Sequence, residues 1–373
     1  MKNYYTYNEI KQQPQLWLTI LDLVEEKESE IKSLLERYQS QPNTEVIFTG
    51  AGSSFFIGEM VSGPFQFYTG ISSHAVPTTE IVTHPELYFN PQKEVLLVSF
   101  ARSGDSPESI AAINNAQQVS SKISNLIICC NKDGELMKMN SRNSTKILLP
   151  EIALDKGLAM TSSVSSMALT ALLIGRINEI KNLRGQINLL GSYANRILEN
   201  NESLFENAIK ANYERVVFLG SGAFLGLARE AHLKLQELTN GKLICKFDSF
   251  LGFRHGPKAV VNDKTLMFYL FSNVKYVRQY ELDMINSMNG KIKSAYSIGV
   301  SETTINAEGL DQLITFSEGD ERLEESFLML AELVVAQLFS FYKSVHEGFN
   351  PDNPSVNGAI HRVVQGVKIY DLP

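Results

Sequence analysis

The sequence predicts an α/β protein with two tandem domains, each a parallel sheet between layers of helices, preceded by an N-terminal helix. Three observations predict this fold. The 373 residues exceed the roughly 250–300 at which one hydrophobic core stops growing. Apolar runs of strand length alternate with helical patterns, as in buried parallel sheets. Finally, the segment VIFTGAG, which begins at Val46, is repeated in similar form as VVFLGSG, which begins at Val216.

The elements follow in order along the chain. Apolar residues at helical spacing between Pro14 and Gln39 predict one amphipathic helix, so that residues 1–40 form an N-terminal helical segment. EVIFTGAGSSFFIGEM and EVLLVSFARSGDSPESIAAINNA each read as strand, loop and helix, and NLIICC and KILLP add two more strands. We expect a first domain over 41–200 and a second over 201–373. The helix-rich connector from Met160 to Asn212 has no glycine or proline cluster, which predicts close association of the domains.

The two halves differ in one loop. The offset along the chain that relates VIFTGAG to VVFLGSG also aligns VLLVSF, which begins at Val95, with TLMFYL, which begins at Thr265. The first copy then continues as ARSGDSP, whereas the second continues as FSNVKYV. We therefore expect the halves to have diverged in function.

Composition excludes several classes of protein. The 34 Lys and Arg against 41 Asp and Glu give a net charge of -7, so we expect no nucleic-acid partner. The N-terminus lacks a signal-peptide core, and polar residues interrupt the longest apolar stretches, so we expect neither secretion nor a membrane span. Three cysteines without disulfide or CxxC spacing fit a cytoplasmic protein, and the six histidines lack metal-ligand spacing. No metal and no cofactor are expected.

Polar loops follow two strands of the first half. Gly50, Gly52 and Ser53 lie between a strand and a helix, where backbone amides attract an anion, although GAGSS fits neither GxGxxG nor a Walker loop. Arg102 and the ARSGDS loop follow the next strand. Because carboxyl ends of parallel strands meet at one edge of a sheet, the two loops predict an anion site there. Tight turns without a ligand are the alternative.

A third polar cluster, TSSVSS, begins at Thr161 and precedes an apolar helix. It could face the same ligand or only cap the helix. In the second half, Glu230, Lys234 and Glu237 share one helix face, and His255 lies in the turn FRHGPKA. A solvated charged face and a surface turn are the plain alternatives for these residues.

Together, GAGSS, ARSGDS, the KLQE helix and the HGP turn resemble the sugar isomerase (SIS) domain proteins in order and spacing. The chain is similar to the isomerase half of glucosamine-6-phosphate synthase. It is more similar to the tagatose-6-phosphate ketose/aldose isomerase and galactosamine-6-phosphate deaminase/isomerase group, including the ending HRVVQGVKIYDLP. The resemblance covers nearly the whole chain and implies two tandem SIS domains.

The resemblance also implies roles for individual residues. Glu237 would be the enolisation base, His255 would open the sugar ring from the partner subunit, and Lys234 would belong to the catalytic helix. The residues implied to bind the substrate phosphate are Gly52, Ser53, Arg102, Ser103, Ser106, Thr161 and Ser162. The synthase's Schiff-base lysine is not reproduced, since Gln365 stands near that position and Lys368 follows later.

The implied reaction converts galactosamine 6-phosphate to tagatose 6-phosphate and ammonia by enolisation and ketimine hydrolysis. The stretch before Val46 is too short for a glutaminase domain, which favours ammonia release over synthesis. One alternative is a ketose/aldose isomerase of neutral sugar phosphates, and another is a non-catalytic sugar-phosphate sensor. The galacto configuration rests on the resemblance alone. We expect a cytoplasmic homodimer or higher homo-oligomer with shared active sites.

Overall fold

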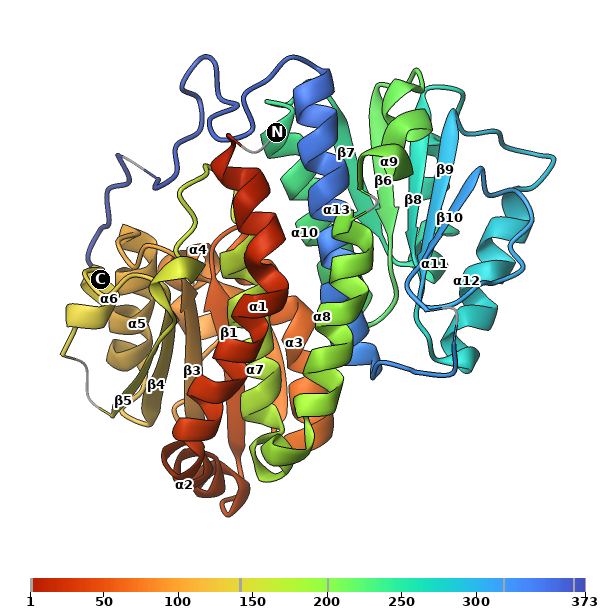
Figure 1. The fold of residues 1–373 in the computed structure, drawn as a ribbon. Coiled ribbons are helices and arrows are strands. Elements are labelled where there is room, and N and C mark those ends of the chain that lie inside the picture. Colours follow the sequence, from red (N-terminus) through yellow and green to blue (C-terminus); the bar gives the residue numbers. More distant parts are fainter. Residues whose placement is uncertain (1–2, 141–142, 200, 318, 365, 373) are drawn as a thin grey trace. The chain divides into compact units, whose positions relative to one another are not determined.

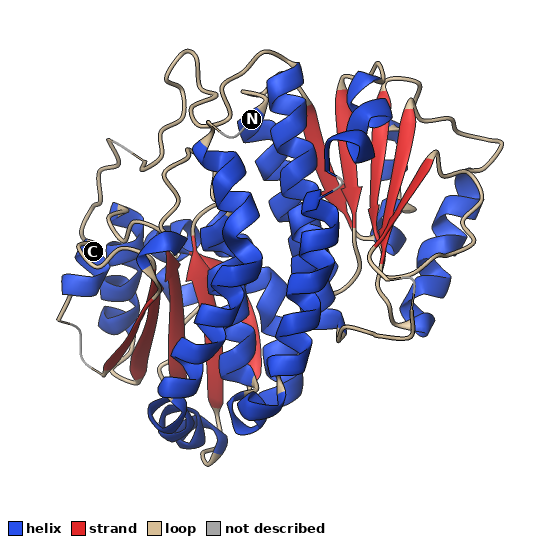
Figure 2. Cartoon of the chain, in the orientation of Figure 1, coloured by secondary structure: helices blue, strands red, loops and turns tan. Residues whose placement is uncertain are grey.

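The computed structural model describes residues 3–140, 143–199, 201–317, 319–364 and 366–372. It contains two five-stranded parallel sheets with helices on both faces, which confirms the predicted fold class (Figure 2). The chain forms two compact units. The first-sheet unit comprises Gln15–Asp155, Met160–Arg184 and Gly358–Pro373, and the second-sheet unit comprises Met1–Pro14, Lys156–Ala159 and Gly185–Asn357.

These units differ from the expected consecutive domains, because the C-terminal tail belongs to the first-sheet unit. Residues 185–199, expected in the first domain, belong to the second-sheet unit. In Figure 1 the dark blue tail ends beside α5 and α6 of the first sheet. The tail can therefore contribute to a site at the first sheet.

The first sheet has the strand order β2-β1-β3-β4-β5. Its strands are β1 (Thr44–Gly50), β2 (Ser72–Pro77), β3 (Glu94–Ala101), β4 (Ile123–Cys129) and β5 (Ser144–Leu148). Its central strands are buried along almost their whole length, which explains their continuous apolar sequences. The helices between Gln15 and Arg184 are the end of α1 (Tyr5–Glu26), α2 (Glu28–Gln39), α3 (Ser53–Thr69), α4 (Thr78–Thr83), α5 (Pro107–Val119), α6 (Glu135–Lys138) and α7 (Ser162–Gly175).

The predicted N-terminal helix is confirmed, but the structure divides the expected single span into α1 and α2. The helical pattern is present, but it forms two helices that separate at Lys27, whose ψ of 10° leaves the helical range. Glu28 and Glu30 then lie in the first turn of α2, where negative charge is favourable beside the helix dipole. The apolar spacing continues across the break, and this is why the sequence pattern alone reads as one helix.

The second sheet has the order β10-β9-β8-β6-β7, the same arrangement relative to the chain as the first. Its strands are β6 (Arg215–Leu219), β7 (Ile244–Asp248), β8 (Thr265–Leu270), β9 (Tyr296–Ser301) and β10 (Gln312–Thr315). Its helices are α8 (Arg184–Glu199), α9 (Asn201–Lys210), α10 (Ala223–Leu238), α11 (Phe250–Phe253), α12 (Lys275–Met288) and α13 (Glu325–His346). Among the described residues, α13 alone is long and apolar enough to cross a membrane, but its most apolar stretch is 94% buried inside the protein.

The two echoing sequences form the same turn. Gly52 before α3 has φ 56° and ψ -127°, and Gly222 before α10 has φ 58° and ψ -125°. A side chain on Gly50 would lie 2.6 Å from the backbone carbon of Ser54, and one on Gly220 would lie 2.2 Å from the backbone oxygen of Phe224. Both turns therefore require glycine and direct the next helix away from the sheet edge.

Candidate functional site

A cavity of about 120 Å³ lies at the carboxyl edge of the first sheet. The turn after β1, the loop after β3 and the C-terminal tail surround it. Its lining residues are Ala51, Ser54, Phe100, Ala101, Arg102, Ser103, Gly104, Ser106, Ser109, Met160, Arg362, Val363 and Val364. The structure thus brings together Arg102, Ser103 and Ser106 of the predicted anion site.

The loop after β3 is held in one shape by its glycine turn and by hydrogen bonds to neighbouring side chains. Gly104 has φ 76°, and a Cβ there would lie 3.2 Å from the sulfur of Cys129. The Nδ2 of Asn131 donates to the Ser103 carbonyl at 2.9 Å. Ser106 precedes α5 and its hydroxyl donates to Glu108 at 2.6 Å. The loop is therefore preorganised, which favours ligand binding because little further ordering is required.

Two guanidinium groups border this cavity. Arg102 is 7% exposed and donates to the backbone oxygen of Arg362. The Nε of Arg362 in turn donates to the backbone oxygen of Asp155 at 2.9 Å. Arg362 is a candidate ligand that our sequence reasoning missed. It lies in the ending HRVVQG, which the resemblance singled out without assigning it a role.

The predicted residues Thr161 and Ser162 are fully buried at the start of α7 and are not among the residues that line the cavity. The buried carboxylate of Asp155 accepts the Thr161 amide at 2.8 Å, the Ser162 amide at 3.1 Å and the Ser163 amide at 3.0 Å. It also accepts all three hydroxyls. The neighbouring Met160 does line the cavity. Asp155 therefore caps α7 where an external anion could otherwise bind.

The predicted residues Gly52 and Ser53 belong to the turn and first residue of α3. Ser53 is 5% exposed. Their neighbours Ala51 and Ser54 line the cavity, whereas they do not. Gly52 and Ser53 therefore shape the backbone of the turn beside the cavity. Their role in binding the ligand stays a prediction.

In the second-sheet unit, α10 carries the predicted acidic and basic face. Lys234 Nζ lies 3.2 Å from Glu230 Oε1 and 3.0 Å from Glu237 Oε2. The side chains of Lys234 and Glu230 are fully buried, while that of Glu237 is 24% exposed. Burial lowers the pKa of Lys234, but the two carboxylates outweigh burial and the net direction is upward. Lys234 is therefore a charged ammonium that fixes Glu237, the member of this group that solvent reaches.

His255 lies on an exposed turn after α11. Its backbone amide donates to the Gly252 oxygen at 3.0 Å, and Gly256 follows with φ 123°. Pro257 then starts a short 3₁₀ turn. The imidazole is thus presented to solvent on a turn of defined shape.

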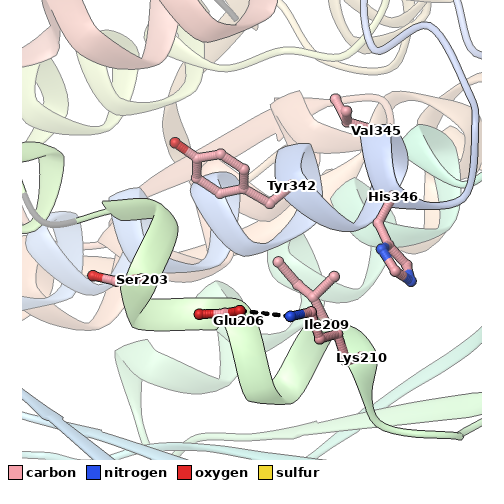
Figure 3. Close-up of a pocket in the computed structure, with 7 residues that line it drawn as sticks. All are labelled: Ser203, Glu206, Ile209, Lys210, Tyr342, Val345 and His346. Carbon is pink, nitrogen blue, oxygen red and sulfur yellow. Dashed lines mark hydrogen bonds and ion pairs between the residues drawn. The ribbon is translucent and has the colours of Figure 1, made fainter.

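A larger cavity, of about 560 Å³, lies between α9 and the end of α13 (Figure 3). It is lined by Ser203, Glu206, Ile209, Lys210, Tyr342, Val345 and His346, none of which the sequence had indicated. Lys210 Nζ pairs with Glu206 Oε1 at 2.5 Å, as the dashed line in Figure 3 marks. This pairing compensates the ammonium charge, so the cavity is less suited to a phosphate than the one beside Arg102.

The paired sheets and the polar loop after β3 define a protein of the SIS class, and the SIS domain family matches residues 40–175. The D-galactosamine-6-phosphate deaminase AgaS of Escherichia coli is 37% identical, over 98% of this chain and 95% of that protein. The chain belongs to the SIS-domain family that includes AgaS.

Solved structures agree with this assignment. One from Clostridium novyi NT, named provisionally as a tagatose-6-phosphate ketose/aldose isomerase, has a TM-score of 0.95 and 38% identity, covering 99% of this chain and 95% of that one. The tagatose-6-phosphate ketose/aldose isomerase of Escherichia coli has a TM-score of 0.90 and 33% identity, with coverage of 100% and 98%. The predicted family is thereby confirmed.

Proposed function

We propose that this enzyme is a deaminase/isomerase that converts D-galactosamine 6-phosphate to tagatose 6-phosphate and ammonia. The observation that carries the proposal is the Glu230, Lys234 and Glu237 group on α10, in a chain 37% identical over nearly its full length to a D-galactosamine-6-phosphate deaminase. A buried ammonium that holds a partly exposed carboxylate is suited to proton transfer on a bound sugar. The proposed reaction needs no metal or cofactor.

The phosphate of the substrate is proposed to bind in the cavity at the first sheet. Arg102 supplies a positive charge, and the hydroxyls of Ser103 and Ser106 and the loop amides supply donors. Gly52, Ser53, Thr161 and Ser162 are proposed to support this site through the adjoining turn and helix start.

His255 is proposed to open the sugar ring by moving the O1 proton to the ring oxygen. Glu237 then removes the proton from C2 to give an enolamine, and returns a proton to C1. The product is a C2 ketimine. Water adds to C2, the C–N bond breaks, and ammonia leaves, which yields the ketose phosphate. Lys234 keeps Glu237 in place throughout and is not itself the base.

The second candidate is a ketose/aldose isomerase of tagatose 6-phosphate. The names of the Clostridium novyi and Escherichia coli structures favour it. It uses the same base, because a C2 hydroxyl in place of the amine gives an enediol and then a ketose without loss of ammonia. We further propose that the protein is cytoplasmic and acts as a homodimer or higher homo-oligomer in which His255 serves the partner's active site.

The test is to incubate the purified chain with D-galactosamine 6-phosphate and measure ammonia and tagatose 6-phosphate together. We expect both products in equal amounts. Glu237→Gln keeps the side-chain shape but cannot accept the proton, so its rate should fall by about 10²–10⁴. Glu214→Gln, an exposed carboxylate of the same unit, is the matched control. Interconversion of neutral sugar phosphates without ammonia release would establish the second candidate, and full activity of Glu237→Gln would exclude Glu237 as the base.

A further inference from the structure

Four glutamates gather at the carboxyl edge of the second sheet. Glu302 directly follows β9, Glu281 lies on α12, and Glu325 and Glu332 lie on α13. Glu281 and Glu332 are fully buried, Glu302 is 1% exposed and Glu325 is half-buried. The positive charge of Arg278 acts on Glu281 and Glu332. If all four were ionised, three buried negative charges and a half-buried one would gather beside Arg278, which is costly in a protein interior.

Two of these glutamates accept hydrogen bonds from neighbouring side chains. Glu302 accepts hydrogen bonds from the Tyr193 hydroxyl at 3.2 Å and from Asn273 Nδ2 at 2.9 Å. Glu325 accepts one from the Ser272 hydroxyl. These contacts give both carboxyl groups hydrogen-bond donors.

Glu281 and Glu332 differ from them. Glu281 Oε2 accepts the Ser272 amide at 3.1 Å, but its Oε1 has no hydrogen-bond partner among the described residues. Neither carboxyl oxygen of Glu332 has one there, and the same is true of the buried hydroxyls of Ser301 and Ser326. A fully buried ionised carboxylate without donors is not stable, whereas a protonated one is neutral and can donate.

The equivalent edge of the first sheet is built differently. There the helix after β3, α5, carries Ala111 and Ala112, and the edge is hollow. In the second sheet the helix after β8, α12, carries Glu281, whose carboxyl takes the Ser272 amide that a ligand could otherwise bind. This edge is therefore filled by the chain's own acidic side chains.

We propose that the carboxyl edge of the second sheet is a proton-binding site, in which Glu281 and Glu332 together hold at least one proton in the folded chain near neutral pH. Loss of that proton places uncompensated charge at the edge and loosens it.

The pKa directions agree with this geometry. Burial raises the pKa of Glu281 from its ordinary value of 4.5 to about 7, while the Ser221 hydroxyl, the Ser272 amide and Arg278 act to lower it. Burial, with Glu281 beside it, raises the pKa of Glu332 well above 4.5. A folded chain that retains protons the unfolded chain has lost becomes less stable as pH rises from 4.5 through about 7. For Glu281 the stability then stays level at higher pH.

The site is linked to the helix that carries the proposed base. Ser221, whose hydroxyl lowers the pKa of Glu281, immediately precedes Gly222 at the start of α10. Ionisation of Glu281 therefore changes the charge beside the first turn of α10. As far as it concerns activity, this link rests on the proposed function.

The test compares the full chain with the double variant Glu281→Gln, Glu332→Gln, and with Glu308→Gln as an exposed control in the same unit. The melting temperature is measured without substrate between about pH 6 and about pH 8.5. The wild type and the control should lose roughly 3–10 °C over this range. The double variant should lose clearly less. At saturating galactosamine 6-phosphate, we expect kcat of the wild type to fall as the pH rises over this range, and we expect a smaller fall in the double variant.

Should the double variant fail to fold, infrared spectroscopy of the wild type decides the question. A protonated carboxyl band should persist at about pH 6.5, where exposed carboxyls are ionised, and should fade toward about pH 8.5. Equal pH dependence of melting in the wild type and a folded double variant, or no protonated carboxyl in the wild type, would overturn the proposal. The melting and infrared measurements need no substrate, so a chain without deaminase activity would refute the proposed function and leave these two measurements intact.

Discussion

Replacement of Asp155 by asparagine tests the capping of α7 by a single atom exchange. Each carboxylate oxygen accepts three hydrogen bonds. Oδ1 takes the Ser162 amide and the hydroxyls of Thr161 and Ser162, while Oδ2 takes the amides of Thr161 and Ser163 and the Ser163 hydroxyl. Asparagine offers only one acceptor oxygen, so it must leave at least one of the three fixed amides facing a donor.

The magnitude follows from which amide is lost. With the asparagine oxygen at the Oδ2 position, two amides keep their acceptor and the Ser162 amide loses its own. The hydroxyls can rotate, but a backbone amide cannot. One buried unsatisfied amide costs about 1–3 kcal/mol, and removal of a negative charge from a helix N-terminus costs a further ~0.3–2 kcal/mol. We expect Asp155→Asn to lower the free energy of unfolding by about 1–5 kcal/mol.

The chain provides its own reporter for this measurement. Trp17 is its single tryptophan, is fully buried, and donates from Nε1 to the Ser165 hydroxyl on α7 at 3.1 Å. Tryptophan fluorescence during urea unfolding therefore reports on the helix that Asp155 caps. Asp133→Asn, at an exposed position of the same unit, is the control. If Asp155→Asn unfolds within about 0.5 kcal/mol of the wild type, the carboxylate does not cap α7 as described.

Two further predictions concern the proposed active site. The double variant Ser103→Ala, Ser106→Ala should raise KM for the sugar phosphate at least tenfold while kcat changes little, because each hydrogen bond to a charged group contributes about 1.5–3 kcal/mol. Steady-state kinetics measure both constants. An unchanged KM would show that these hydroxyls do not bind the phosphate. His255→Ala and Glu237→Gln should each be inactive alone. A mixture of the two, with subunit exchange verified by different tags, should regain activity, because one site of each mixed dimer is intact. Verified exchange without regained activity would show that both residues serve one site from the same chain.

The fold was predictable because its signals are local. A buried parallel strand needs a continuous apolar run, and the glycine turns before α3 and α10 need residues that tolerate positive φ, so each leaves a mark within a few positions. The break at Lys27 has no local sequence signal, because the apolar residues keep the same helical spacing on both sides of it.

The site was predictable only in part. Arg102, Ser103 and Ser106 belong to one short loop and could be found together. Arg362 could not, because its contacts are with Asp155, 207 residues away, and Arg102, 260 residues away. The serine cluster after Thr161 left two interpretations open, ligand binding and helix capping. The choice between them depends on Asp155, whose own position before the helix gives no sign that its side chain turns back toward the amides.

Charge balance separates the two acidic groups of the second-sheet unit. On α10, the buried Glu230 shares the ammonium of Lys234 with Glu237, so a buried carboxylate can stay ionised and hold a neighbour in place. Glu332 on α13 has no such partner among the described residues, and Arg278 interacts with several carboxylates at once. A buried acid without a cation must be compensated in another way, and the proton is the smallest group able to do it. The same side chain is therefore expected to work as a fixed ionised carboxylate on one helix and as a titrating acid on another.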